Sequence, residues 1–361
     1  MRSIYPIRLD HAGAWRVYLG GKRIRELRGE EHPQDNHYPE EWIASTTPAT
    51  GTRAVPEQGL SRLAERPSLF LRNVIAAAPD GFLGRAFVRA HGCHCGVLLK
   101  LLDAAERLNV QVHPDRAAAR RLWGSPYGKT ECWHFLPGRA IDGKPPVFYM
   151  GLQEHVTRAE FRRAFESGDP GQLLECMYAF EAKPGQTVLV ESGVPHALGA
   201  GCFALEIQEP SDLTLRLERR TASGSVVPDE ICHLGVGYDT MFSLIRYDHL
   251  SREKLLQKYV IEPTTLYEGP NGRIVCLVDE AACSYFQMDR VEVMSCLDLP
   301  APAQFYGLFV LQGKGQLLCE ELHYPLFPGE QFFVPADCPA IRLSADEPLC
   351  IIRFSGPQAP V

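Results

Sequence analysis

Residues 184–196 read Pro-Gly-Gln-Thr-Val-Leu-Val-Glu-Ser-Gly-Val-Pro-His, and residues 328–340 read Pro-Gly-Glu-Gln-Phe-Phe-Val-Pro-Ala-Asp-Cys-Pro-Ala. Pro, Gly, Val and Pro recur at the same places in both stretches. A Pro-Gly turn, an apolar strand and a second tight turn are typical of a jelly-roll β-sandwich, and their recurrence indicates duplication. The sequence therefore predicts a mainly β protein with two jelly-roll domains, residues 1–240 and 241–361.

The two copies differ at their last position, which is His196 in the first and Ala340 in the second. An imidazole can bind a metal ion and a methyl group cannot. We therefore expect any metal chemistry in the N-terminal domain and a second domain without metal ligands.

A helical insertion is expected near residues 152–178, where the period of apolar residues changes. Thr157 and Glu160 have the spacing of a capping box. Asp169 and Pro170 fit an N-cap followed by proline in the first helical turn. The first domain should therefore contain a small helical insertion between its strands.

Two further segments have a predicted structure. The residues from Trp15 to Leu19 alternate in the way that a strand does. The spacing of apolar residues between Leu60 and Gly84 favours short helices.

Composition excludes several classes of protein. The chain has 361 residues, 45% hydrophobic and 22% charged, with a net charge of −7, so bulk attraction to nucleic acid or to an anionic membrane is not expected. No apolar run approaches the roughly 20 residues that a membrane span needs. The N-terminal residues contain no apolar core of signal-peptide length. A cytoplasmic location is the prediction.

The twelve cysteines are scattered and many lie in apolar runs, which favours reduced, buried thiols over a disulfide framework. The triplet Cys93-His94-Cys95 has no second cluster with zinc-finger spacing to complete a metal site. We therefore interpret it as packing at the start of a buried segment.

Two polar pairs point to chemistry: Gln111 with His113, and Lys129 with Glu131. On a strand, residues two apart point to the same face, so each pair can aim two polar side chains into one site while Val112 packs on the other side. Imidazole, carboxylate and amide oxygen can all bind metal ions. A lysine beside such a carboxylate adds positive charge where an anionic substrate could bind.

His196 completes this set. Together with Gln111, His113 and Glu131 it offers two nitrogen and two oxygen donors, a mixture that suits Zn²⁺ and that Mn²⁺, Fe²⁺ and Co²⁺ also accept.

These residues belong to a family pattern: the chain resembles the class I, zinc-dependent mannose-6-phosphate isomerases, which are cupins. The resemblance runs in the family's order over residues 1–220. The motifs that carry it are Gln111-Val-His113-Pro114, Lys129-x-Glu131-x-Trp133, Pro195-His196-Ala197, and Glu206-Ile-Gln208-x-x-Ser211-Asp212-x-Thr214-x-Arg216, with weaker matches at Pro39-Glu-Glu-Trp42 and Leu99-Lys100-Leu-Leu-Asp103.

The resemblance implies a metal-dependent enzyme that interconverts mannose 6-phosphate and fructose 6-phosphate, or a close sugar phosphate, through a cis-enediolate. It implies one zinc ion per chain, bound by Gln111, His113, Glu131 and His196. A metal ion and an arginine can hold the negative charge of the enediolate.

The family pattern also implies the substrate-handling residues. Arg216 and Lys129 would be catalytic, and Lys100, Glu206 and Asp212 would bind substrate. For the general base, the sequence leaves Glu206, Asp212, Lys129 and His134 open.

Several positions depart from the family pattern. They include Asn109 in place of serine, Leu215 in place of an aromatic residue, the unusual Glu209-Pro210 dipeptide, and the absence of a glycine-rich turn near Trp15. These changes spare the metal ligands and concern the expected sugar pocket.

Two other functions compete with the isomerase reading. A cupin dioxygenase or other metal oxidoreductase would use a site dominated by histidines, which Gln111 and the Lys129-x-Glu131 motif disfavour. A non-catalytic sugar-phosphate-binding cupin would have no need of Arg216 and Lys129. The expected partner is therefore a small sugar phosphate.

Overall fold

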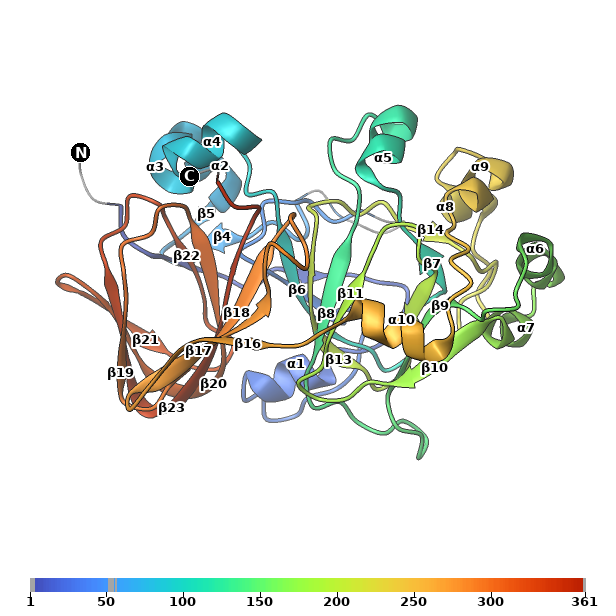
Figure 1. The fold of residues 1–361 in the computed structure, drawn as a ribbon. Coiled ribbons are helices and arrows are strands. Elements are labelled where there is room, and N and C mark those ends of the chain that lie inside the picture. The colour runs from blue at the N-terminus through green and yellow to red at the C-terminus, as the bar shows by residue number, and fades with distance from the viewer. Residues whose placement is uncertain (1–3, 51–54, 56, 360–361) are drawn as a thin grey trace.

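A computed structural model describes residues 4–50, 55 and 57–359. Strands make up 36% of the chain and helices 19%, so the prediction of a mainly β protein is confirmed. Figure 1 shows the strands of the C-terminal half on one side of the molecule and most strands of the N-terminal half on the other.

An eleven-stranded sheet is built mainly from the C-terminal half. Its order is β16 (Thr264–Gly269), β17 (Gly272–Val278), β18 (Gln287–Val293), β23 (Ile341–Ser355), β20 (Tyr306–Cys319), β22 (Gln331–Val334), β1 (Ile7–Leu9), β4 (Arg62–Leu63) and β5 (Arg66–Phe70); β19 (Cys296–Leu299) pairs with β23, and β21 (Leu322–Leu326) pairs with β20.

Two further sheets belong to the N-terminal half. The seven-stranded sheet has the order β15 (Val260–Ile261), β11 (Thr187–Val190), β8 (Glu131–Phe135), β13 (Phe203–Gln208), β6 (Leu98–Asp103), β3 (Glu40–Ile43) and β2 (Gly13–Ala14). The five-stranded sheet has the order β10 (Met177–Glu181), β9 (Val147–Leu152), β12 (His196–Leu198), β7 (Gln111–Val112) and β14 (Leu215–Arg216).

The two halves of the chain exchange strands. β1 pairs antiparallel with β22 of the C-terminal half, and β15 pairs antiparallel with β11 of the N-terminal half. The division into two jelly-roll domains at residues 240 and 241 stays a prediction.

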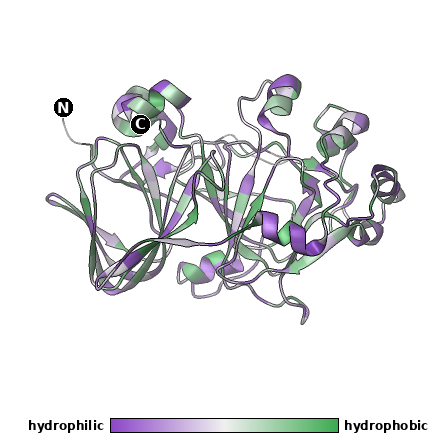
Figure 2. Ribbon diagram, viewed as in Figure 1, coloured by the Kyte–Doolittle hydropathy of each residue, from purple (hydrophilic) through white to green (hydrophobic). Residues whose placement is uncertain are grey.

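The helices are short and lie outside the sheets. They are α1 (Lys22–Leu27), α2 (Leu71–Ala77), α3 (Pro79–Leu83), α4 (Arg85–His91), α5 (Arg116–Trp123), α6 (Arg158–Ser167), α7 (Pro170–Glu175), α8 (Asp229–His233), α9 (Tyr238–Ser243) and α10 (Arg252–Tyr259). Helices such as α1 and α10 carry both hydrophilic and hydrophobic stretches, as expected when one face packs on a sheet (Figure 2).

The expected helical insertion is α6 and α7, which lie between β9 and β10. Thr157 and Glu160 form the capping box at the start of α6, and Asp169 caps α7 with Pro170 in its first turn. The apolar faces of these helices join a core cluster with Val112 on β7 and with Val110 just before it, and both valines are fully buried. The two valines therefore pack away from the polar pairs, as predicted.

Both repeat copies form the same local structure. Gly185 and Gly329 have φ values of 84° and 90°, a left-handed conformation that favours glycine. Each glycine leads into a short buried strand, β11 in the first copy and β22 in the second.

The strand predicted from Trp15 to Leu19 is wrong. Its backbone makes isolated contacts in place of a ladder: Arg16 N–H donates to His37 O, and Leu19 N–H donates to the Glu106 carboxylate.

The helices predicted between Leu60 and Gly84 are correct only after residue 70. Before it, β4 and β5 extend the sheet beyond β1. Pairing at the exposed edge of the sheet therefore outweighs the helical pattern of the sequence before residue 70. Pro67 is tolerated in β5 because β5 is an edge strand.

The described cysteines are all free thiols, and most are buried, while Cys93 is exposed. Among the described residues, no helix is long and apolar enough to cross a membrane.

Candidate metal centre

Two rows of side chains define the site. Because directly paired residues point to the same face of a sheet, the strand register places one row on each sheet of the N-terminal half. The row on the seven-stranded sheet is Trp42, Lys100, Glu206 and Trp133. The row on the five-stranded sheet is Arg216, Gln111, His196 and Met150.

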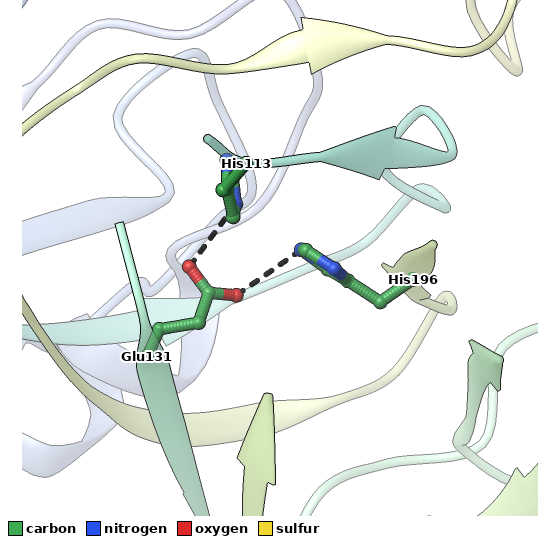
Figure 3. Close-up of side chains that lie close together, drawn as sticks. All are labelled: His113, Glu131 and His196. Carbon is green, nitrogen blue, oxygen red and sulfur yellow. Dashed lines mark ion pairs between the residues drawn. The ribbon is translucent and has the colours of Figure 1, made fainter. Parts of the chain in front are cut away.

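Three side chains converge between these sheets (Figure 3). The Nε2 atom of His113 lies 3.3 Å from one carboxylate oxygen of Glu131, and the Nε2 atom of His196 lies 3.2 Å from the other. The potential ligand atoms of all three residues lie within 4.8 Å of one another, and all three side chains are buried.

Gln111 joins this group. Its Nε2 atom lies 3.2 Å from Nε2 of His196, its direct strand partner. The structure thus brings together all four residues that the sequence singled out as ligands.

Backbone carbonyls fix the orientation of both imidazoles. Nδ1 of His113 lies 2.9 Å from Leu213 O, and Nδ1 of His196 lies 2.8 Å from Val194 O. A carbonyl only accepts hydrogen bonds, so each Nδ1 carries the proton. Each Nε2 therefore turns its lone pair toward Glu131, which is the arrangement that metal-binding histidines adopt.

Electrostatics favour neutral imidazole and ionised carboxylate. Burial and the Lys129 ammonium together lower the pKa of His113 to about 3, against the opposing attraction of Glu131. Burial opposes ionisation of Glu131, but the attraction of Lys129, whose Nζ lies 3.1 Å away, outweighs it and holds the pKa of that carboxyl well below its usual range.

The residues present fit a divalent cation. Neither oxygen of buried Glu131 accepts a hydrogen bond from a described residue, although Lys129 Nζ lies 3.1 Å from one of them. Buried carboxylate oxygens without hydrogen bonds are costly, and a cation between the three side chains would satisfy them. Two imidazole nitrogens, a carboxylate and an amide oxygen are suitable ligands.

The predicted substrate residues surround this centre. Lys100 and Glu206 form a buried ion pair of 2.8 Å. Asp212 accepts hydrogen bonds from the backbone and hydroxyl of Thr50.

Arg216 lies next to Gln111 in the strand register. It donates only to backbone carbonyls, those of Thr214 and Ile231. Burial lowers its pKa, while the charge of Asp212 acts to raise it. The guanidinium thus remains without a close carboxylate partner among the described residues.

The sequence analysis missed two members of the site, Arg16 and Glu40. Arg16 Nε donates to Glu40 at 2.8 Å and its NH2 lies 3.6 Å from Asp212. Burial acts to raise the pKa of Glu40, but Arg16 and Lys100 outweigh it and lower that pKa. The weak motif that ends at Trp42 was the signal that could have located Glu40.

His134 lies outside the site. On β8 it is three residues from Glu131, and its Nδ1 contacts Thr187 Oγ1 at 2.9 Å. Since alternate strand residues face opposite sides, His134 points away from the cluster and is not available as the general base. Cys93 and Cys95 belong to no group of three metal-binding side chains in the described part of the chain.

The fold and the centre together define a mainly β protein with a buried histidine–carboxylate cluster that could hold a metal ion. Residues 12–127 match the family model described as phosphomannose isomerase type I, catalytic domain. The chain is 29% identical over 240 residues to a probable mannose-6-phosphate isomerase, GmuF, of Bacillus subtilis (strain 168), covering 66% of this chain and 69% of the relative.

Solved structures share the fold. The mannose 6-phosphate isomerase of Bacillus subtilis superposes with a TM-score of 0.76 at 23% identity, covering 97% of this chain and 99% of that one. A mannose 6-phosphate isomerase bound with zinc and yttrium superposes with a TM-score of 0.69 at 17% identity, covering 98% of this chain and 100% of that one. These comparisons show that the chain is similar to the phosphomannose isomerases in sequence over residues 12–127 and in fold over 97% of its length.

Proposed function

We propose that this chain is a metal-dependent aldose–ketose isomerase that interconverts mannose 6-phosphate and fructose 6-phosphate. The observation that carries the proposal is the buried cluster of Gln111, His113, Glu131 and His196, with the cations of Lys129 and Arg216 beside it. The match of residues 12–127 to the phosphomannose isomerase model and the similarity to a probable mannose-6-phosphate isomerase support this choice of substrate.

We propose zinc as the metal, one ion per chain, held by those four side chains. The donor set suits zinc, and a structural neighbour is bound with zinc and yttrium. When bound, the ion supplies a Lewis acid for the oxygen atoms of the substrate.

The chain's own residues account for the remaining chemistry. Isomerisation moves a proton between C1 and C2 and passes through a cis-enediolate with negative charge on oxygen. We propose that Arg216, whose guanidinium donates to two backbone carbonyls among the described residues, holds that charge, because its planar fork suits two neighbouring oxygens. Lys129 adds a second positive charge next to Glu131.

The other groups would bind and orient the sugar phosphate. The carboxylates of Glu206 and Asp212 can accept hydrogen bonds from sugar hydroxyls, and Lys100 holds Glu206 in an ion pair of 2.8 Å. With His134 facing outward, the proton-transfer group is one of Lys129, Glu206 and Asp212. The cytoplasmic location stays a prediction.

The test combines metal analysis with a substrate panel. We expect the purified protein to contain one divalent ion per chain and to isomerise mannose 6-phosphate in preference to other hexose and pentose phosphates. Chelation should abolish the activity and zinc should restore it. Oxygen uptake without isomerisation, or tight binding of sugar phosphates without turnover, would contradict the proposal.

A further inference from the structure

After His113 the chain runs away from the metal centre, and it returns there at Glu131. The residues between them are the excursion. The two ends of this excursion touch, because Lys129 N–H donates to Pro114 O at 3.0 Å. A Cβ atom at Gly128 would lie 2.7 Å from the same oxygen, so only glycine fits there. Whatever holds the two ends therefore also sets the distance between His113 and Glu131.

Glu209 holds both ends. Its side chain is 1% exposed. One carboxylate oxygen lies 2.5 Å from Nε of Arg116, at the start of the excursion, and the other accepts the Thr130 N–H at 3.0 Å, at its end. Glu209 N–H also donates to Thr130 O at 3.1 Å. Thr130 is flanked by Lys129 and Glu131, so Glu209 fixes the backbone that presents both groups.

The C-terminal half reaches this contact through Tyr285, in the connection between β17 and β18. The Arg116 guanidinium lies 4.1 Å from the centroid of the Tyr285 ring, a cation–π contact. The Arg116 side chain is 39% exposed. Its guanidinium also lies 5.9 Å from the centroid of the Tyr127 ring, so Tyr285 is the nearer of these two aromatic contacts. The charge of Arg116 is thus held between Glu209 and Tyr285.

We propose that Tyr285, Arg116 and Glu209 form a brace through which the C-terminal half positions Lys129 and Glu131 for catalysis. Glu209 is a positioning residue in this brace, because it touches backbone and Arg116 but no atom of the metal cluster. A carboxylate is required at this place, since one oxygen must accept from an amide while the other faces a guanidinium. This inference rests on the proposed isomerase activity for its kinetic consequence.

The first test is kinetic and uses matched controls. Arg116→Ala and Tyr285→Ala should each lower kcat roughly ten-fold, because small misplacements of catalytic groups are costly, while KM stays within about two-fold. The controls are Arg120→Ala, an exposed position on α5, and Tyr267→Ala, a tyrosine 42% exposed on β16. Both controls should keep the wild-type kcat.

Further variants separate the brace from general packing. In Glu209→Gln the amide oxygen can still accept the Thr130 N–H, but the group facing Arg116 is then an NH2, which cannot accept a hydrogen bond. This variant should therefore also lower kcat. The double variant of Arg116→Ala and Tyr285→Ala should be no slower than Arg116→Ala alone, since both changes break one link. Additive losses, or a kcat equal to that of the controls, would overturn the brace.

A second measurement does not depend on turnover or on metal. Hydrogen exchange of the backbone amides of residues 129–135, measured in the metal-free protein, should be faster in Arg116→Ala and Tyr285→Ala than in the controls. If the wild type isomerises no sugar phosphate, the proposed function is wrong. The hydrogen-exchange rates would then be the only test of whether the brace positions residues 129–135. Unchanged exchange in both variants would overturn it.

Discussion

His113 and His196 show how this fold orients single residues as candidate metal ligands. Each ring is held from behind by a backbone carbonyl, so its protonated nitrogen is fixed and its other nitrogen faces Glu131. The orientation of each imidazole ring therefore depends on the local path of the backbone, and no additional side chain is needed to fix it. It follows that removing either ring should affect metal binding more than folding.

His113→Ala should abolish stoichiometric metal binding, because one of two nitrogen donors is lost. Metal content after dialysis, measured by atomic spectrometry, checks this. His134→Ala is the matched control, since His134 is also buried but faces Thr187 on the other side of β8. Full metal occupancy in His113→Ala would remove this residue from the site.

Arg216→Ala should lower kcat by at least about 100-fold, which corresponds to about 2.7 kcal/mol, with metal content unchanged. The reason is that the enediolate would lose the guanidinium that we propose to hold its charge. Arg216→Lys should not restore full activity, because an ammonium cannot reproduce the planar fork. Steady-state kinetics decide this.

Arg219→Ala serves as its control, since that arginine pairs with Asp229 in an exposed ion pair. If Arg216→Ala keeps a kcat/KM close to that of the wild type, the metal and Lys129 must stabilise the negative charge of the enediolate without Arg216.

At the scale of elements, the register of β8 decides which side chains face the centre. Glu131 and Trp133 point inward, and Cys132 and His134 point outward. Short elements such as α6 contribute stability but no chemistry, because their apolar faces cover the outer side of the five-stranded sheet. Substitutions in these helices should therefore lower the stability of the protein without changing its activity.

Thr157→Ala should lower the free energy of unfolding by about 1 kcal/mol, because α6 loses its capping box. Urea denaturation followed by circular dichroism measures this. The activity of the folded variant should equal that of the wild type. A change in kcat with unchanged stability would show that α6 acts on the site after all.

At the scale of the whole molecule, Gln331 joins the two halves. It is fully buried on β22, accepts the Ala44 N–H at 2.8 Å, and donates to Glu41 at 3.1 Å. Ala44 directly follows β3, the strand that carries Glu40 and Trp42. The C-terminal sheet thus supports the strand behind the substrate residues.

Gln331→Leu should lower the free energy of unfolding by about 1–3 kcal/mol, since it leaves buried polar partners without a hydrogen bond. Gln316→Leu, an exposed position on β20, should change it little. Equilibrium denaturation of both variants provides the comparison. Equal stability of the two would mean that the halves associate through apolar packing alone.

The sequence by itself determined those features that depend only on residues close together along the chain. The repeat at residues 184 and 328, the capping box at Thr157 and the donor types of Gln111, His113, Glu131 and His196 could all be read directly. Each follows from backbone geometry or ligand chemistry within a few residues. The mainly β character and the metal-capable set were therefore predictable.

Only the tertiary structure decided which distant residues meet. Arg16 lies in a segment that resembles a strand, yet it reaches Glu40 on β3 and Asp212 in the connection between β13 and β14. The face of β8 that excludes His134 and the contact of Tyr285 with Arg116 likewise depend on register and packing. Side-chain chemistry is local, but burial and pairing arise from contacts between residues far apart in the chain.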